Sequence, residues 1–353
     1  MQHGAQHPKC STEDMKNIFI SGNGVAACCC AYLLKKAGMR VALQHSDRPR
    51  LPAILLSESA LSLMEGVFGE LSFGQSHRIS RRMVAWGRDA KAVAVAHSAW
   101  VVSEQSLLAA LWSKVDLDDE GEPDWTIFAS RPVPTEISDQ RFGTRTASVV
   151  TVTLAEGTDA SSCWIESLDD GWLFLIPNAP GRALVLGVGD LVVSLLQRSR
   201  VIGGQIAAHG ESAGEFPAHP RILSSLCGDR WLACGTAAMA FDPLCGDGTS
   251  HAIREAILAA AIIQAAAGGE DPDELRSHYE SRLLAGFGRH LALCSQFYKT
   301  GNRGSWWDGE LKSLEEGMAW CGKQLGNRRD FRYQLNGFEL QPTGERISAR
   351  YEP

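Results

Sequence analysis

Hydrophobic runs separated by glycine predict a strand, a helix and a second strand near the start of the chain. An apolar run ends at Gly22, apolar residues at helical spacing continue from about Val25 to Ala37, and residues 40–43 form another short apolar run. A strand that enters a glycine-rich turn and then a helix is the first half of a dinucleotide-binding βαβ unit. We therefore expect such a unit over residues 16–43.

The glycine-rich turn supplies the first candidate cofactor-binding residues. They stand at the expected start of the helix: Gly22, Asn23, Gly24, Val25 and Ala26. The third glycine position is taken by Ala27, which is small enough for close packing of helix and strand. The acidic residue that usually holds a ribose hydroxyl after the second strand is missing. Gln44 or His45 stands there instead, and either can hydrogen-bond a hydroxyl.

A second stretch of small residues is expected to be the other organising element. A short apolar run, Trp231–Cys234, predicts a buried strand, and an alanine-rich helix is predicted to start in the region of residues 246–249. The start of a helix offers unpaired N–H groups and the positive end of a dipole, which suit a group that becomes negative. An ordinary strand–loop–helix joint is the alternative. The candidate binding residues here are Gly235, Thr236, Asp242, Pro243, Gly246, Asp247, Gly248 and Thr249.

The middle of the chain has a different pattern. From Arg145 to about Leu196, apolar and polar residues alternate in runs separated by turn residues, which predicts an antiparallel sheet with one covered face. Residues 78–87 and 93–100 predict a pair of strands. Helices are expected over residues 103–113, 255–267 and 273–300, and the tail from Arg328 is charged and rich in turns.

Composition and charge exclude several classes of function. The 353 residues are 44% hydrophobic and carry a net charge of −7, which favours a packed core and argues against a nucleic-acid binder. No signal peptide or membrane span is apparent, so we expect a cytoplasmic protein that does not enter the membrane. None of the ten cysteines forms a C-x-x-C pair and the histidines do not cluster with them, so no metal is expected. Cys28–Cys30 are interpreted as packing residues, and Cys245 lies in the candidate binding loop.

The two glycine-containing stretches together resemble the FAD-dependent monooxygenase superfamily, and more closely its branch that includes the tryptophan halogenases. In that family the first stretch holds the ADP half of FAD. The second, usually written G-D-A-A and then D-P-x-x-G-x-G, holds the ribityl chain and the flavin ring. This chain matches both stretches, but Thr236 replaces the usual Asp.

Three further segments are similar to the same family. The stretch around Glu58 resembles its G-E-S segment, where Glu58 is either a helix-capping residue or a carboxylate that faces the substrate. Residues 172–177 resemble the W-x-W-x-I-P signature, and residues 298–307 resemble its closing motif or, alternatively, form a hydrophobic staple. The substrate-pocket candidates implied are Glu58, Trp172, Phe174, Pro177 and Trp306. No lysine occurs between Lys36 and Lys91, which argues against halogenation.

The resemblance implies an α/β fold with a Rossmann-like FAD domain of the glutathione-reductase type, an inserted antiparallel substrate domain and C-terminal helices. The implied boundaries are 16–75, 100–135 and 220–270 for the FAD domain, 76–99 and 136–219 for the substrate domain, and 271–353 for the helical region and tail. FAD is the implied cofactor. NAD(P)H or a separate reductase would supply electrons, since the chain has no second nucleotide fingerprint.

The implied activity is hydroxylation of an aromatic ring with reduced FAD and oxygen. Within the superfamily the chain looks most like the LodB-like flavoproteins of tryptophylquinone biogenesis, which implies a tryptophan of a precursor protein as the substrate. A small-molecule aromatic hydroxylase or halogenase is one alternative. A flavin-free protein that only binds a maturation partner is the other.

Overall fold

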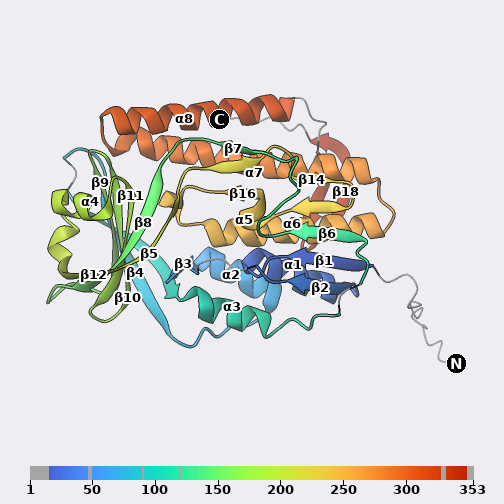
Figure 1. Cartoon of the computed structure of the whole chain (residues 1–353), viewed down its shortest axis with the longest axis horizontal. Helices are drawn as coiled ribbons and strands as arrows, with labels where there is room; N and C mark the ends of the chain where they lie inside the picture. The colour runs from blue at the N-terminus through green and yellow to red at the C-terminus, as the bar shows by residue number, and fades with distance from the viewer. Residues whose placement is uncertain (1–15, 47–49, 90, 120, 327–330, 348–353) are drawn as a thin grey trace.

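The computed structural model describes residues 16–46, 50–89, 91–119, 121–326 and 331–347. The chain has a mixed α/β fold with two large sheets, which lie toward opposite ends of the molecule in Figure 1. The smaller of the two is five-stranded, in the order β14 (Cys227–Gly228), β15 (Trp231–Ala233), β6 (Trp125–Phe128), β1 (Asn17–Ser21) and β2 (Arg40–Gln44). Its pairs are parallel except for the edge pair β14–β15.

The predicted βαβ unit is confirmed. β1 is followed by α1 (Val25–Lys36) and pairs in parallel with β2. Ile18 and Ile20 of β1 are buried in the main hydrophobic core. The small residues of α1, including all three cysteines at 28–30, are also buried, which lets α6 (Gly248–Ala267) pack closely against α1. Their interpretation as packing residues is therefore confirmed.

The larger sheet has eight strands, and all of its pairs are antiparallel except β4–β9. Their order is β12 (Ile206–Pro217), β8 (Thr146–Leu154), β11 (Arg182–Gly189), β10 (Gly171–Ala179), β9 (Ser162–Leu168), β4 (Ser76–Ala85), β5 (Val93–Val102) and β3 (Ile54–Ser57). The alternation between residues 145 and 189 thus predicted the antiparallel strands correctly.

The expectation that this sheet has only one covered face is wrong. On β10, Trp172 and Phe174 belong to the main core, whereas the alternating residues Leu173 and Leu175 belong to a second hydrophobic cluster. The second cluster forms because α4 (Val192–Arg198) packs on the other face of the sheet. The alternating pattern had suggested that the strand region reaches Leu196, whereas residues 192–198 form this helix.

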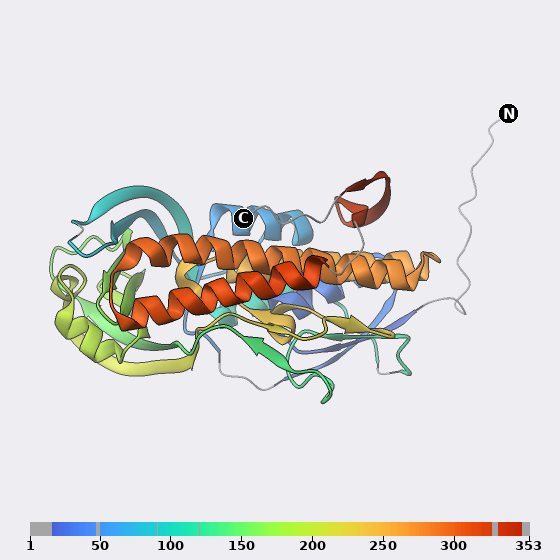
Figure 2. The same cartoon turned by 90° about the horizontal axis from the view of Figure 1, so that it is seen from above.

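Two long helices cover the molecule and run side by side along its length, as Figures 1 and 2 show. They are α7 (Pro272–Gly301) and α8 (Ser305–Gly326), and α8 starts early enough to place Trp306 and Trp307 in its first turn. The other helices are α2 (Glu58–Phe68), α3 (Glu104–Trp112), α5 (Gly235–Ala238) and the short 3₁₀ turns η2 (Gly203–Gln205) and η3 (Pro243–Cys245).

Two small sheets complete the fold. One has the order β16 (Met239–Ala240), β13 (Arg221–Leu223) and β7 (Asp139–Arg141), and the other pairs β17 (Phe331–Asn336) with β18 (Glu339–Ile347). The second sheet lies within the tail that the sequence suggested to be only charged and turn-rich. Within the described residues, no helix is long and apolar enough to cross a membrane.

Candidate functional site

The two glycine turns meet at the carboxyl end of the parallel sheet. Gly22 has a φ of +121°, and a Cβ atom there would lie 2.8 Å from Oγ of Ser130. Gly235 has a φ of +57°, and a Cβ atom there would lie 2.7 Å from Cβ of Ala26. Neither position can carry a side chain without moving its neighbour, because atoms of Ser130 and Ala26 lie too close. The fold therefore brings the two predicted stretches into direct contact.

The residues that replace the usual acid lie next to the first turn. Gln44 and His45 are exposed at the end of β2, and Nδ1 of His45 is 3.4 Å from Nδ2 of Asn23. The backbone carbonyl of Asn23 accepts a hydrogen bond from the indole of Trp112 at 3.0 Å. Thr236, which replaces the other acid, is exposed. These positions leave polar side chains at the surface of the turn, where they can reach a ligand.

The start of α6 is open. Gly246 has a φ of +64°, and a Cβ atom added at Gly246 or Gly248 would have no atom within 4 Å. Asp247 precedes the helix but its side chain does not cap it, so no side chain accepts from the first-turn N–H groups at the N-cap. Unpaired donors at the positive end of a helix attract negative charge. With the bare glycine turns, they fit a flat, anionic cofactor such as FAD.

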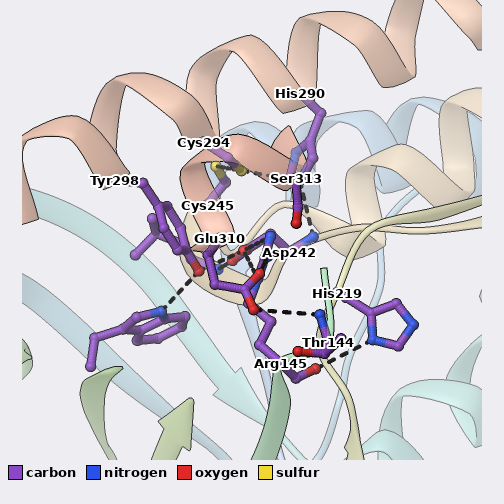
Figure 3. Close-up of polar contacts among 12 residues, drawn as sticks. Thr144, Arg145, His219, Asp242, Cys245, His290, Cys294, Tyr298, Glu310 and Ser313 are labelled. Atoms are coloured by element: carbon purple, nitrogen blue, oxygen red, sulfur yellow. Dashed lines mark hydrogen bonds and ion pairs between the residues drawn. The ribbon is translucent and has the colours of Figure 1, made fainter. Parts of the chain in front are cut away.

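Asp242 takes part in a buried ion-pair cluster rather than facing a ligand. Its Oδ2 lies 2.8 Å from the guanidinium of Arg145 and accepts from the hydroxyl of Tyr298 at 2.9 Å, while its Oδ1 caps η3 through the Leu244 N–H. Arg145 also pairs with Glu310 of α8, as Figure 3 shows. The indole of Trp172 donates to the Tyr298 hydroxyl at 3.3 Å. We call Arg145, Asp242, Tyr298 and Glu310 the ion-pair cluster.

The ion-pair cluster stabilises the buried charge of Arg145. Burial lowers the pKa of Arg145, but the Coulomb interactions with Tyr298, Asp242 and Glu310 outweigh it and raise this pKa above its ordinary value. Burial also raises the pKa of Tyr298, so its hydroxyl remains protonated and donates to Asp242. The predicted cofactor-binding residue Asp242 therefore holds the loop between β16 and α6 in place through protein contacts.

A cavity of about 730 Å³ lies beside the start of α6. Its wall is built from β3, β4 and β5 of the large sheet, the loop of residues 245–247, and facing residues of α6 and α7. Leu55, Phe241 and Leu258 supply apolar surface, and four arginines line it together with two acids, Asp247 and Glu255. Among the lining residues that the structure describes, none is a lysine.

The substrate-pocket candidates from the sequence lie behind or beside this cavity. Ser57, whose hydroxyl accepts from the Ala60 N–H at 3.2 Å, caps α2 as expected, and the exposed Glu58 follows in the first turn of this helix. Ser57 and Ser59 line the cavity, whereas Glu58 is not among its lining residues. Glu58 thus lies in the first turn of α2 and outside the lining of this cavity.

The aromatic candidates pack in the core. Trp172, Phe174 and Pro177 are buried on β10. The Phe174 ring lies 5.4 Å from the guanidinium carbon of Arg82, and Arg82 is one of the residues that line the cavity. The Trp306 ring stacks on Tyr298 with ring centres 6.0 Å apart. None of these four candidate side chains is among the residues that line the cavity.

Glu255 is a site residue that the sequence analysis missed. It lies on α6, is buried, and accepts from the Gly235 N–H at 2.7 Å through Oε2. Burial raises the pKa of Glu255 to about 8, and the hydrogen bond from Gly235 opposes this only in part. No local sequence pattern indicated this contact, because Glu255 lies in the middle of an alanine-rich helix.

The fold also brings Cys245, His290 and Cys294 together. The sequence had indicated no such cluster, because it has no C-x-x-C pair with histidines nearby. The ligand atoms of these three side chains all lie within 4.8 Å of one another, as Figure 3 illustrates. The hydrogen bond with Cys294 and the proximity of His290 lower the pKa of Cys245 to about 6, against the opposing effect of burial. Only the spacing of His290 and Cys294, one helical turn apart, could have signalled this cluster.

Comparisons with known proteins establish the fold. No known protein family matches the sequence, and no curated protein matches it. The solved structure of the peptidyl tryptophan dihydroxylase QhpG, essential for tryptophylquinone cofactor biogenesis, matches with a TM-score of 0.71 at 17% identity, over 93% of this chain and 86% of that chain. The flavin-dependent halogenase CmlS gives 0.72 at 16%, over 93% and 84%. The myxobacterial chondrochloren halogenase CndH gives 0.70 at 16%, over 89% and 90%.

Proposed function

Since the chain has the fold of flavin-dependent halogenases and of a tryptophan dihydroxylase, we propose that it is an FAD-dependent monooxygenase that hydroxylates an aromatic ring. The observation that carries this proposal is the contact between the two glycine turns together with the open, uncapped start of α6. The start of α6 offers backbone donors, and the glycines let a ligand approach the backbone, as binding of a dinucleotide and a flat ring requires. FAD, when bound and reduced, supplies the chemistry that activates oxygen.

The residues divide the binding task between them. In this proposal the turn from Gly22 to Ala26 holds the ADP half, and Gln44 or His45 binds a ribose hydroxyl. The backbone from Gly246 to Thr249 faces the flavin ring and stabilises negative charge on its reduced form. The parallel sheet is then an FAD domain of the glutathione-reductase type, and the eight-stranded sheet is the substrate layer.

The cavity suits a substrate that presents an aromatic ring flanked by acidic groups. Its apolar wall suits a ring, and its four arginines are Arg82, Arg254, Arg282 and Arg289. They outnumber the two lining acids, although the whole chain carries a net charge of −7. A locally positive cleft on an acidic protein attracts negatively charged ligands. The absence of lysine from the described cavity wall supports hydroxylation rather than halogenation.

Exposed apolar side chains near the cavity favour a protein substrate. Val93 and Val95 of β5 are 62% and 49% exposed, and Val95 pairs across the strands with the cavity residue Arg82. On α7, Leu293 lines the cavity and Phe297 lies one turn further along, each 43% exposed. Clusters of exposed apolar residues mark contact sites for other proteins. We propose a precursor protein that presents a tryptophan, with NAD(P)H or a separate reductase as the electron source.

Titration of the purified chain with FAD tests the cofactor. We expect flavin absorption that remains after desalting. Gly248→Leu fills the open space at the start of α6 and should abolish this binding. Gly309→Leu is the matched control, because Gly309 is also an exposed helical glycine with no atom within 4 Å of an added Cβ, but it lies in α8. If neither oxidised nor reduced FAD binds to the folded wild-type chain, the enzymatic proposal is wrong and a flavin-free partner-binding protein becomes the better account.

Mass spectrometry tests the substrate. The FAD-loaded chain, a reductant and oxygen are incubated with candidate precursor proteins, and the tryptophan-containing peptides are analysed for a gain of one or more oxygen atoms. Oxidation of free aromatic metabolites without oxidation of any protein would favour the small-molecule hydroxylase instead. Incorporation of halide would favour a halogenase.

A further inference from the structure

The thiol and imidazole cluster of Cys245, His290 and Cys294 has the composition of a metal site. Cys245 belongs to the loop before α6, whereas His290 and Cys294 lie one turn apart on the same face of α7. Sγ of Cys245 is 3.8 Å from Sγ of Cys294, and this second sulfur is 3.3 Å from Nε2 of His290. His290 and Cys294 are buried, and Cys245 is partly buried at the cavity wall.

Two of the three separations between the ligand atoms agree with tetrahedral coordination. With Zn–S bonds of about 2.3 Å and Zn–N bonds of about 2.0–2.1 Å, tetrahedral geometry places two sulfurs about 3.8 Å apart and a sulfur and a nitrogen about 3.5 Å apart. The observed separations, 3.8 and 3.3 Å, are within a few tenths of an ångström of these values. The ligand atoms of the third pair, Cys245 and His290, lie within 4.8 Å of each other.

The imidazole of His290 is already in the tautomer that a metal ligand requires. The Asp242 N–H donates to Nε2 of His290 at 3.0 Å, so Nε2 carries a lone pair and the ring proton is on Nδ1. A metal ligand must offer such a lone pair, and a bound ion would take it over from the Asp242 N–H. Figure 3 shows His290 and Cys294 on α7 and Cys245 on the loop turned toward one another.

A second thiol pair shows what a packing pair looks like in the same protein. Sγ of Cys30 and Sγ of Cys234 are 3.9 Å apart and fully buried, and the Cys30 thiol also donates to the carbonyl of Ala256. That pair forms no three-ligand group with a histidine or acid within the described residues. The two pairs differ in the imidazole and in contact with the cavity, not in the distance between sulfurs.

We propose that Cys245, His290 and Cys294 bind one Zn²⁺, with the fourth coordination position directed toward the cavity. Two thiolates and a neutral imidazole balance the charge of the ion, which suits a buried position, and binding releases to solvent the protons that remain on the thiols. The ion fastens the loop of residues 239–247 to α7 and leaves one position for water or a ligand from the cavity. The site stands whether or not the chain binds FAD.

Metal analysis of the full chain tests the site. Flavin-free protein is reduced, treated with chelator, reconstituted with Zn²⁺ and desalted. We expect about one Zn²⁺ per chain, the stoichiometry of a single site. Reconstitution with Co²⁺ should give the intense thiolate-to-cobalt charge-transfer band of a cysteine-ligated ion. Cys294→Ala should reduce the retained metal to near zero, and Cys234→Ala, which changes the packing pair, should retain it.

Stability measurements keep the test independent of variant folding. Zn²⁺ should raise the melting temperature of the wild-type chain and of Cys234→Ala, but not that of Cys294→Ala. The proposal is overturned if the folded, reduced wild-type chain retains no Zn²⁺, or if Cys294→Ala retains as much as the wild type. A disulfide between Cys245 and Cys294, detected in the chain as purified by the loss of two hydrogens, would also overturn it and identify a redox pair.

Discussion

The glycine turns and the ion-pair cluster both join segments that are distant in the sequence, but with opposite chemistry. At Gly22 and Gly235 the chain removes side chains, which lets neighbouring segments approach closely. Around Arg145 the chain buries charges and satisfies them within the protein. The first arrangement depends on the absence of side chains, whereas the second depends on buried charged side chains that hold the fold. Asp242 shows the difference, because it stands in the predicted binding loop but serves the ion-pair cluster.

The largest effect is expected from removing the cation of the ion-pair cluster. Arg145→Met leaves the carboxylates of Asp242 and Glu310 buried without a counter-charge and should lower the free energy of unfolding by about 3–5 kcal/mol. Arg81→Met is the control, since it breaks the exposed pair of Arg81 with Asp159 and should cost under about 1 kcal/mol. Urea unfolding measures both. Equal losses would mean that the ion-pair cluster is no more important to stability than a surface pair.

A smaller effect is expected from substituting two buried tyrosines. Tyr298 belongs to the ion-pair cluster, and Tyr279 contacts the strand that leads to Gly235. Tyr298→Phe removes a hydroxyl that donates to a carboxylate and accepts from the Trp172 indole, and should cost about 1.5–3 kcal/mol. Tyr279→Phe removes a buried hydroxyl that donates to the carbonyl of Ala233, and should cost only about 0.5–1.5 kcal/mol. Urea unfolding of the two variants compares them directly. A greater loss for Tyr279→Phe would contradict the distinction between the two regions.

The sequence could predict the first region because its information is local. The strand and helix periods around residues 17–44, the bare turn at Gly22 and the start of α6 all follow from residues adjacent in the chain. Contacts of the second region are not local, since Arg145 lies 97 residues from Asp242 and 165 from Glu310. No short pattern indicates which buried arginine meets which acid.

The same limit applies to the pocket and to the cysteines. The alternation of polar and apolar residues placed Trp172 and Phe174 on one face of a strand. It could not show that these side chains would pack in the main core with residues of α7 and α8 instead of lining the cavity. The cluster of Cys245 with His290 and Cys294 depends on the packing of a loop against a helix about 49 residues later in the chain. Only the tertiary structure brings such residues together.

The smallest change, when expressed per pH unit, concerns Glu255, which accepts from the Gly235 N–H. Its pKa in the folded chain is about 8, above its ordinary value of 4.5, so between these values the folded state binds more protons than the unfolded state. The free energy of unfolding contributed by this residue is therefore fully present below pH about 4.5 and is lost as the pH rises through about 8, by at most about 1.4 kcal/mol per pH unit. Glu255→Gln should remove this slope in urea unfolding midpoints, while Glu65→Gln, on the exposed side of α2, should keep it. If the wild type and Glu255→Gln share one pH profile, Glu255 is ionised beneath the glycine turn. The glycine turns would then contain a buried charge, as the ion-pair cluster does. This negative charge would lie next to the backbone donors that are proposed to bind an anionic cofactor.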